Sequence, residues 1–103
     1  MAALYRAKGF EILASNWRCS IGELDLVLRQ GGLLVFCEVK TRRGSAFGAP
    51  FEAVHQAKRR KLRALAQAFL SSHSGAESVR FDVASVTVPA GGRPQVYVFE
   101  EAF

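Results

Sequence analysis

Two strand-like segments joined by a pair of glycines constrain the fold of this 103-residue chain more than any other feature. Leucines alternate with other residues through Glu23–Gln30, and Leu33–Lys40 is rich in Val, Leu and Phe, as buried strands are. Gly31-Gly32 supplies the positive φ angles that a two-residue hairpin turn requires. The sequence therefore predicts a β-hairpin in which Leu28 pairs with Val35.

This register predicts one apolar face and one charged face. The apolar face consists of Leu24, Leu26, Leu28, Val35, Cys37 and Val39. On the other face Asp25 lies opposite Glu38 and Glu23 lies opposite Lys40. Cross-strand neighbours have Cβ atoms ~4.5–5.5 Å apart, where two carboxylates repel each other or force one to hold a proton. One interpretation is a surface network in which Glu23 pairs with Lys40 and Asp25 with an arginine.

A divalent cation between the two carboxylates gives a second interpretation. Mg²⁺, or Mn²⁺ in its place, takes one or two carboxylates together with water and substrate phosphate. Lys40 projects to the same side as Glu38, where an ammonium group stabilises negative charge developing on a phosphate or assists the attacking water. The hairpin thus predicts a site for metal-assisted phosphodiester hydrolysis, with Asp25 and Glu38 as metal ligands and Lys40 as a catalytic residue.

The positive charge of the chain lies mostly in one segment. The net charge is +5, yet residues 40–63 hold eight Lys or Arg residues against one acid, Glu52. Such a segment indicates a polyanion-facing surface, with a solvated helix face as the alternative. The candidate nucleic-acid-binding residues are Arg42, Arg43, Lys58 and Arg59. A small interaction domain whose basic helix binds an acidic protein remains a further alternative.

The remaining pattern predicts a single α/β domain over residues 1–103 in which one long amphipathic helix covers a sheet face. The expected elements are a helix over Ala2–Lys8, a strand over Phe10–Cys19, the hairpin, a polar loop over Thr41–Ala49, a helix from Pro50 to about Ser72, and strands over Val79–Val88 and Gln95–Phe99. Arg80 and Asp82 are expected to form a structural ion pair, and Trp17 to pack in the core.

Several classes of protein are excluded on composition. No apolar run approaches the ~18–20 residues of a membrane helix, and the first residues lack the apolar segment of a signal peptide. Cys19 and Cys37 form no Cys-x-x-Cys motif, so neither a structural zinc site nor a disulfide framework is expected. The expected location is the cytoplasm.

The motifs of the hairpin and the helix resemble those of a known family. The matching segments are Gly-Glu-Leu-Asp-Leu-Val from Gly22, Val-Phe-Cys-Glu-Val-Lys-Thr-Arg from Val35, Phe-Gly-Ala-Pro from Phe47, Ala53-Val54, Lys58, and Arg-Phe-Asp-Val from Arg80. Together they are similar to the bacterial YraN-like family and the PD-(D/E)xK nuclease superfamily, which includes archaeal Holliday-junction resolvases.

The resemblance implies a restriction-endonuclease-like mixed β-sheet flanked by helices. It also implies a magnesium-dependent endodeoxyribonuclease acting on branched or structured DNA, as a homodimer in the resolvase relatives. Asp25 and Glu38 would then hold the metal, Lys40 would be the catalytic lysine, Glu23 an accessory acid, and Lys58 a helix residue near the site.

Two features depart from the family pattern. Leu24 stands where the superfamily has proline before its aspartate. The family also carries a Gly-Glu pair ahead of the segment that matches Ala2-Ala3, where the present sequence begins, and in resolvases that glutamate helps to hold metal. This second departure motivates the alternative hypothesis of a non-catalytic nucleic-acid-binding module that retains the nuclease fold.

Overall fold

A computed structural model describes residues 1–43, 56–89 and 91–103 of the chain. Within these ranges the elements are α1 (Ala2–Ala7), β1 (Glu11–Arg18), β2 (Glu23–Gln30), β3 (Leu33–Arg43), α2 (Gln56–Ser71), β4 (Ser78–Val88) and β5 (Gln95–Phe99). Neither described helix is long and apolar enough to cross a membrane. The predicted element order is confirmed.

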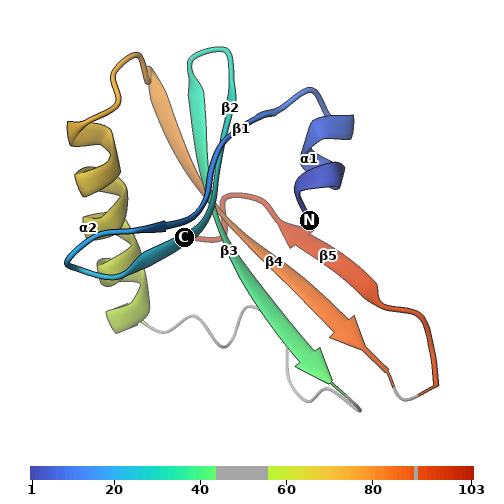
Figure 1. Ribbon diagram of the computed structural model, residues 1–103. Coiled ribbons are helices and arrows are strands. Elements are labelled where there is room, and N and C mark those ends of the chain that lie inside the picture. The colour runs from blue at the N-terminus through green and yellow to red at the C-terminus, as the bar shows by residue number, and fades with distance from the viewer. Residues whose placement is uncertain (44–55, 90) are drawn as a thin grey trace.

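The five strands form one mixed sheet in the order β1-β2-β3-β4-β5. Neighbouring strands are antiparallel except β3 and β4, which run parallel. Parallel strands need a long crossover connection, and α2 lies within the one between β3 and β4. The two helices lie on either side of the sheet (Figure 1). Helix α2 lies beside the curled β1–β2 part, and α1 lies on the opposite side, near the C-terminal end of β5. The chain is therefore an α/β protein, as predicted.

The central hairpin has the predicted register. Leu28 pairs with Val35 and Gln30 with Leu33, and the ladder continues to the pair of Leu26 and Cys37. Gly31 has a φ of 59°, the left-handed conformation that glycine adopts without steric cost. The turn chemistry and the apolar alternation thus specify the same pairing.

Two apolar clusters pack on opposite faces of the sheet. The α2 cluster contains Leu24, Val27, Leu34, Phe36, Leu62, Leu65, Ala66 and Phe69, with Trp17 packed against it as predicted. The α1 cluster contains Tyr5, Phe10, Leu26, Leu28, Val35, Cys37 and Ala84. The prediction that Leu24 shares a face with Leu26 was wrong. The β2–β3 ladder ends at Leu26, and on the β1 side Asn16 has a left-handed φ of 52° between the partners of Leu26 and Leu24, so the backbone is irregular where the alternation fails.

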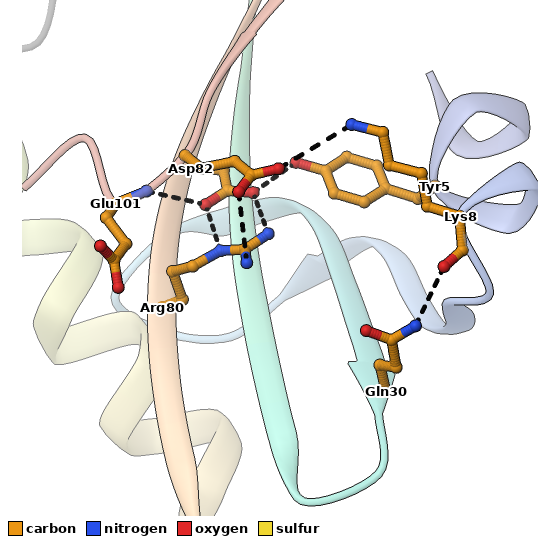
Figure 2. A network of polar contacts seen from close by, with 7 residues as sticks. Tyr5, Lys8, Gln30, Arg80, Asp82 and Glu101 are labelled. Atoms are coloured by element: carbon orange, nitrogen blue, oxygen red, sulfur yellow. Dashed lines mark hydrogen bonds and ion pairs between the residues drawn. The ribbon is translucent and has the colours of Figure 1, made fainter.

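The polar contacts of Asp82 join three distant parts of the chain (Figure 2). The Tyr5 hydroxyl donates a hydrogen bond of 2.7 Å to Asp82 Oδ2, and Arg80 donates two of 2.9 Å to the same carboxylate. The Glu101 N–H donates a further bond of 3.2 Å. These bonds hold α1 and the C-terminal residues against β4. The structural ion pair predicted for Arg80 and Asp82 is confirmed, and its hydrogen bond raises the pKa of Arg80.

Strand β3 is longer than the sequence predicts. The expected loop begins at Thr41, whereas β3 continues in parallel with β4 to the pair of Arg43 and Val88. The backbone of β4 supplies hydrogen-bond partners to a segment whose own composition is polar. The rest of the expected loop, and the first part of the helix predicted from Pro50, lie outside the described residues.

Candidate functional site

A cleft of about 280 Å³ opens between α2 and the end of the hairpin away from its turn. It is lined by Glu23, Asp25, Glu38, Lys58, Lys61, Leu62 and Leu65. The cleft therefore combines three acids from two adjacent strands with two lysines from the helix that faces them. Its two leucines also belong to the α2 cluster, so the charged groups stand directly on the hydrophobic core.

Asp25 is held at the point where the hairpin ladder ends. Its Oδ2 accepts a hydrogen bond of 2.8 Å from the backbone N–H of Val39. Counted from the turn, the last β2–β3 pair is Leu26 with Cys37, directly before Asp25 is reached. Beyond this pair the Asp25 carboxylate serves as the acceptor for the Val39 amide of β3. An aspartate here orients its own carboxyl group while it satisfies the backbone of the neighbouring strand.

Glu38 is the most enclosed acid of the cleft. The residue is 8% exposed, and both nearby ammonium groups approach the same oxygen. Lys58 Nζ lies 3.5 Å from Glu38 Oε1, and Lys40 Nζ lies 3.9 Å from it. One lysine comes from α2 and the other from β3, so Glu38 links the helix to the sheet.

The environment of Glu38 raises the pKa of its carboxyl above the usual value. Burial is the largest cause, and Asp25 raises the pKa further through its negative charge and through hydrogen bonding. The positive charges of Lys58 and Lys40 act in the opposite direction. Asp25 and Glu38 therefore interact across the hairpin, and the raised pKa is the physical result expected when two carboxyl groups face each other.

Glu23 and Lys40 have other partners than those the surface-network interpretation assigned them. Glu23 accepts a hydrogen bond from Arg18 Nε, its cross-strand neighbour on β1, while Lys40 approaches Glu38. Glu23 nevertheless lines the cleft. Lys40 lies two residues after Glu38 on β3, and its ammonium group approaches the same Glu38 oxygen as the ammonium group of Lys58 does.

The four candidate nucleic-acid-binding residues differ in position. Lys58 lines the cleft, whereas the guanidinium of Arg59 lies over the Phe103 ring at 5.5 Å from its centroid. The backbones of Arg42 and Arg43 form the end of β3, but their side chains lie outside what the structure describes. The structure thus brings Lys58 to the acids, and Arg59 to the C-terminal residues.

Lys61 is a cleft residue that the sequence did not single out. It lies three positions after Lys58 on α2, a spacing that puts two side chains on the same helix face. It also approaches the turn between β1 and β2, where a Cβ added to Gly22 would lie 3.0 Å from Lys61 Cε. Helical periodicity counted from Lys58 could have identified it.

The capacity of the cleft for a metal ion follows from its donors and its size. Among the described residues, no group of three or more His, Cys, Asp or Glu side chains is arranged to hold a metal. Mg²⁺, however, is commonly held by one or two carboxylates with water completing its shell. At ~30 Å³ per water molecule, a cleft of about 280 Å³ has room for a hydrated cation. Asp25 and Glu38 therefore fit a hydrated Mg²⁺ and do not form a fully protein-built metal cage.

Comparison with known proteins gives one family. Residues 1–86 match the model described as "Uncharacterised protein family UPF0102". A UPF0102 protein of Nocardia farcinica is 48% identical over 96 residues, which cover 92% of this chain and 76% of that protein. A UPF0102 protein of Frankia alni is 52% identical over 98 residues, covering 94% and 82%. A UPF0102 protein of Rhodococcus opacus is 45% identical over 105 residues, covering 100% and 89%.

Proposed function

The chain belongs to the UPF0102 family, the YraN-like family that its motifs resemble, and from the acidic cleft and the nuclease-like motifs that line it we propose that it is a metal-dependent nuclease. It would hydrolyse phosphodiester bonds in branched or structured DNA. The observation that carries the proposal is the Asp25–Glu38 pair, enclosed against the core with two lysines on one carboxylate oxygen.

The arrangement supports a hydrolytic site because each charged group has a role in that chemistry. Asp25 and Glu38 would hold Mg²⁺ or Mn²⁺, which when bound supplies Lewis-acid stabilisation of charge on the phosphate. Lys40 would stabilise the negative charge that develops on the phosphate oxygens. Lys58 and Lys61 at the rim would bind neighbouring phosphates.

The sheet supports assignment to the PD-(D/E)xK superfamily. We propose that the mixed sheet, with its hairpin and its α2 crossover, is of the restriction-endonuclease-like type. In this chain the acid-x-lysine motif is Glu38-Val39-Lys40 on β3. The acid that precedes it in the motif is Asp25 on the paired strand β2. The two motif segments thus lie on adjacent strands, as such a site requires.

A second candidate function is nucleic-acid binding without catalysis. Two observations favour it: Lys58 and Lys40 already neutralise Glu38, and the described residues hold no group of three metal-ligating side chains. This module would retain the fold and bind phosphates with α2. It would show salt-sensitive DNA binding and no magnesium site by calorimetry.

The experiment that tests the nuclease is cleavage of a four-way DNA junction in the presence of Mg²⁺ or Mn²⁺. We expect Asp25→Asn, Glu38→Gln and Lys40→Met each to reduce the rate by at least about 10²-fold, the loss typical of removing one charge-stabilising group. Matched controls are Glu11→Gln and Lys8→Met, which change exposed residues away from the cleft and should retain activity.

Two results would contradict the proposal. Cleavage that survives Asp25→Asn and Lys40→Met would place the chemistry elsewhere or reveal a contaminating enzyme. DNA binding without cleavage would support the non-catalytic module if calorimetry also detects no saturable magnesium site. A magnesium site that Glu38→Gln abolishes would count against that module.

A further inference from the structure

The two edges of the sheet differ in their protection against pairing with another strand. At one edge, β1 has a register shift between Ile12 and Ala14, and Asn16 has a left-handed φ of 52°. Its exposed residues include Glu11 and Arg18. Bulges, irregular backbone and charged side chains are the features by which natural edge strands avoid such pairing.

The other edge, β5, is five residues long and follows Pro94, and both short length and proline limit pairing, but it has none of the features that protect β1. Its sequence Gln95–Phe99 carries no charged residue, and its pairing with β4 is regular throughout. Val96 and Tyr97, which face opposite sides of the strand, are 40% and 53% exposed. In Figure 1, β5 forms the outer margin of the sheet, and its C-terminal end lies near α1. The outer edge of β5 therefore has the composition of a strand that can pair with a further strand.

Charges at the two ends of β5 indicate what the strand pairs with. Arg93 precedes the strand and Glu101 follows it, and neither side chain has an ion pair among the residues the structure describes. The adjacent Glu100 is engaged by Lys8 and Arg80 within the same chain. An antiparallel copy of β5 would bring the Arg93 end of one molecule beside the Glu101 end of the other. The edge is therefore complementary to itself.

We propose that β5 pairs with β5 of a second copy of this chain, antiparallel and centred on Tyr97. The pairing would place the two tyrosines opposite each other, a favourable cross-strand contact between aromatic rings. Two Arg93–Glu101 pairs would flank it, one at each end. The result is a two-fold symmetric dimer with one sheet continuous across both copies.

The dimer also determines how the two clefts are oriented. Adjacent antiparallel strands are related by a two-fold axis perpendicular to the sheet, so both copies expose the same sheet face on the same side. Helix α2 and the Asp25–Glu38 cleft of each copy would then face one substrate. This orientation bears on the proposed function, whereas the interface itself does not depend on it.

Sedimentation velocity over about a hundredfold range of protein concentration tests the proposal. Pairing through one short strand buries less than the ~800 Å² per partner of a stable complex, so we expect a monomer–dimer equilibrium that shifts with concentration. Tyr97→Lys places two like charges opposite each other and should abolish the dimer. Ser15→Lys is the matched control, because it adds the same charge to the β1 edge, and should leave the dimer unchanged.

A charge exchange distinguishes this interface from any other. Arg93→Glu and Glu101→Arg should each weaken dimerisation, and the two substitutions together should restore it. Circular dichroism and thermal unfolding would verify that every variant is folded. A chain that stays monomeric at all concentrations would overturn the proposal. So would a dimer that Ser15→Lys disrupts and Tyr97→Lys does not, or a double exchange that fails to restore association.

Discussion

At the scale of single residues, the environment of Glu38 opposes its negative charge. A carboxylate prefers water, yet this one is enclosed by the α2 cluster and faces Asp25. The ammonium groups of Lys40 and Lys58, which lie near its Oε1, offset in part the free-energy cost of burying this charge. Because burial raises the pKa of Glu38, the folded state holds its proton more tightly than the unfolded chain does. Residues that conflict with folding in this way are characteristic of functional sites.

The effect of Glu38 on stability therefore depends on pH, and Glu38→Gln should reveal it. Stability from a raised carboxyl pKa is fully present below the usual value of 4.5 and is lost as pH rises through the folded-state value. Glutamine keeps the shape without the charge. We expect the variant to be more stable than the wild type at pH 7, within the ~0.5–2 kcal/mol typical of stabilising substitutions. The difference should vanish near pH 4.

Urea denaturation of both proteins at the two pH values provides the measurement. Glu11→Gln is the control, because Glu11 is exposed on β1 and its removal should change stability little at either pH. A Glu38→Gln variant less stable than the wild type at pH 7 would mean that the lysine pairs outweigh burial.

The adjacency of Asp25 and Glu38 could be predicted because strand alternation and a glycine turn together determine register. The bond from Val39 N–H to Asp25 could not, since it arises where the ladder ends, and no residue pattern marks that position. The position of Arg59 against Phe103 was equally inaccessible. That contact joins residues far apart in the chain, and local periodicity carries no information about it.

At the scale of elements, α1 packs against the sheet through Tyr5. This short helix contributes Tyr5 as its one buried residue, and that side chain packs edge-on against Phe10. The Tyr5 hydroxyl reaches Asp82, which is fully buried. Because a six-residue helix has little stability of its own, its position depends on these tertiary contacts.

Tyr5→Phe should accordingly destabilise the protein by about 1.5–3 kcal/mol, the range for a hydrogen bond to a charged group. The ring and its apolar contacts stay, so the loss reports the hydroxyl alone. Leu4→Ala on the same helix is the matched control, since Leu4 is 43% exposed, and its effect should stay within about 0.5 kcal/mol. Urea denaturation measures both. Equal stability of Tyr5→Phe and wild type would show that Arg80 and Glu101 alone satisfy Asp82.

The extent of β3 illustrates which element boundaries a sequence determines. Its start follows from the glycine turn, a local signal, and was predicted correctly at Leu33. Its end at Arg43 depends on pairing with β4, which begins only at Ser78, after the α2 crossover. Pairing with β4, rather than local composition, therefore sets the end of the strand. The expected start of the loop at Thr41 was wrong for this reason, and residues 44–49 lie outside the described residues.

At the scale of the whole molecule, the charge distribution combines a basic chain with an acidic cleft. A net charge of +5 favours association with a polyanion such as nucleic acid. If the chain is the proposed nuclease, a scissile phosphate would bind beside the three cleft acids, Glu23, Asp25 and Glu38, which would repel it. Lys40 and Lys58 offset the charge of Glu38 in part, and a bound cation would offset the remaining acid charge further. Metal binding and substrate binding are therefore expected to reinforce each other.

This coupling predicts that removing a cleft acid strengthens DNA binding in the absence of metal. Asp25→Asn should tighten binding by about 1 kcal/mol, or roughly fivefold in Kd, as removal of one repelling charge near a surface implies. The salt dependence should stay the same, because the number of phosphates neutralised by lysine and arginine is unchanged. Lys58→Gln should instead weaken binding and reduce the salt slope by about 1.

Fluorescence anisotropy with a labelled junction, in chelator and at several salt concentrations, measures both the affinity and the slope. Glu11→Gln controls for a change in net charge, because it removes one negative charge outside the cleft and should alter Kd less than Asp25→Asn does. If Asp25→Asn and Glu11→Gln change Kd equally, the phosphate does not approach Asp25, and net charge alone accounts for binding. If Asp25→Asn weakens binding, Asp25 contacts the DNA directly or positions β3 through Val39, and the acids do not repel the substrate.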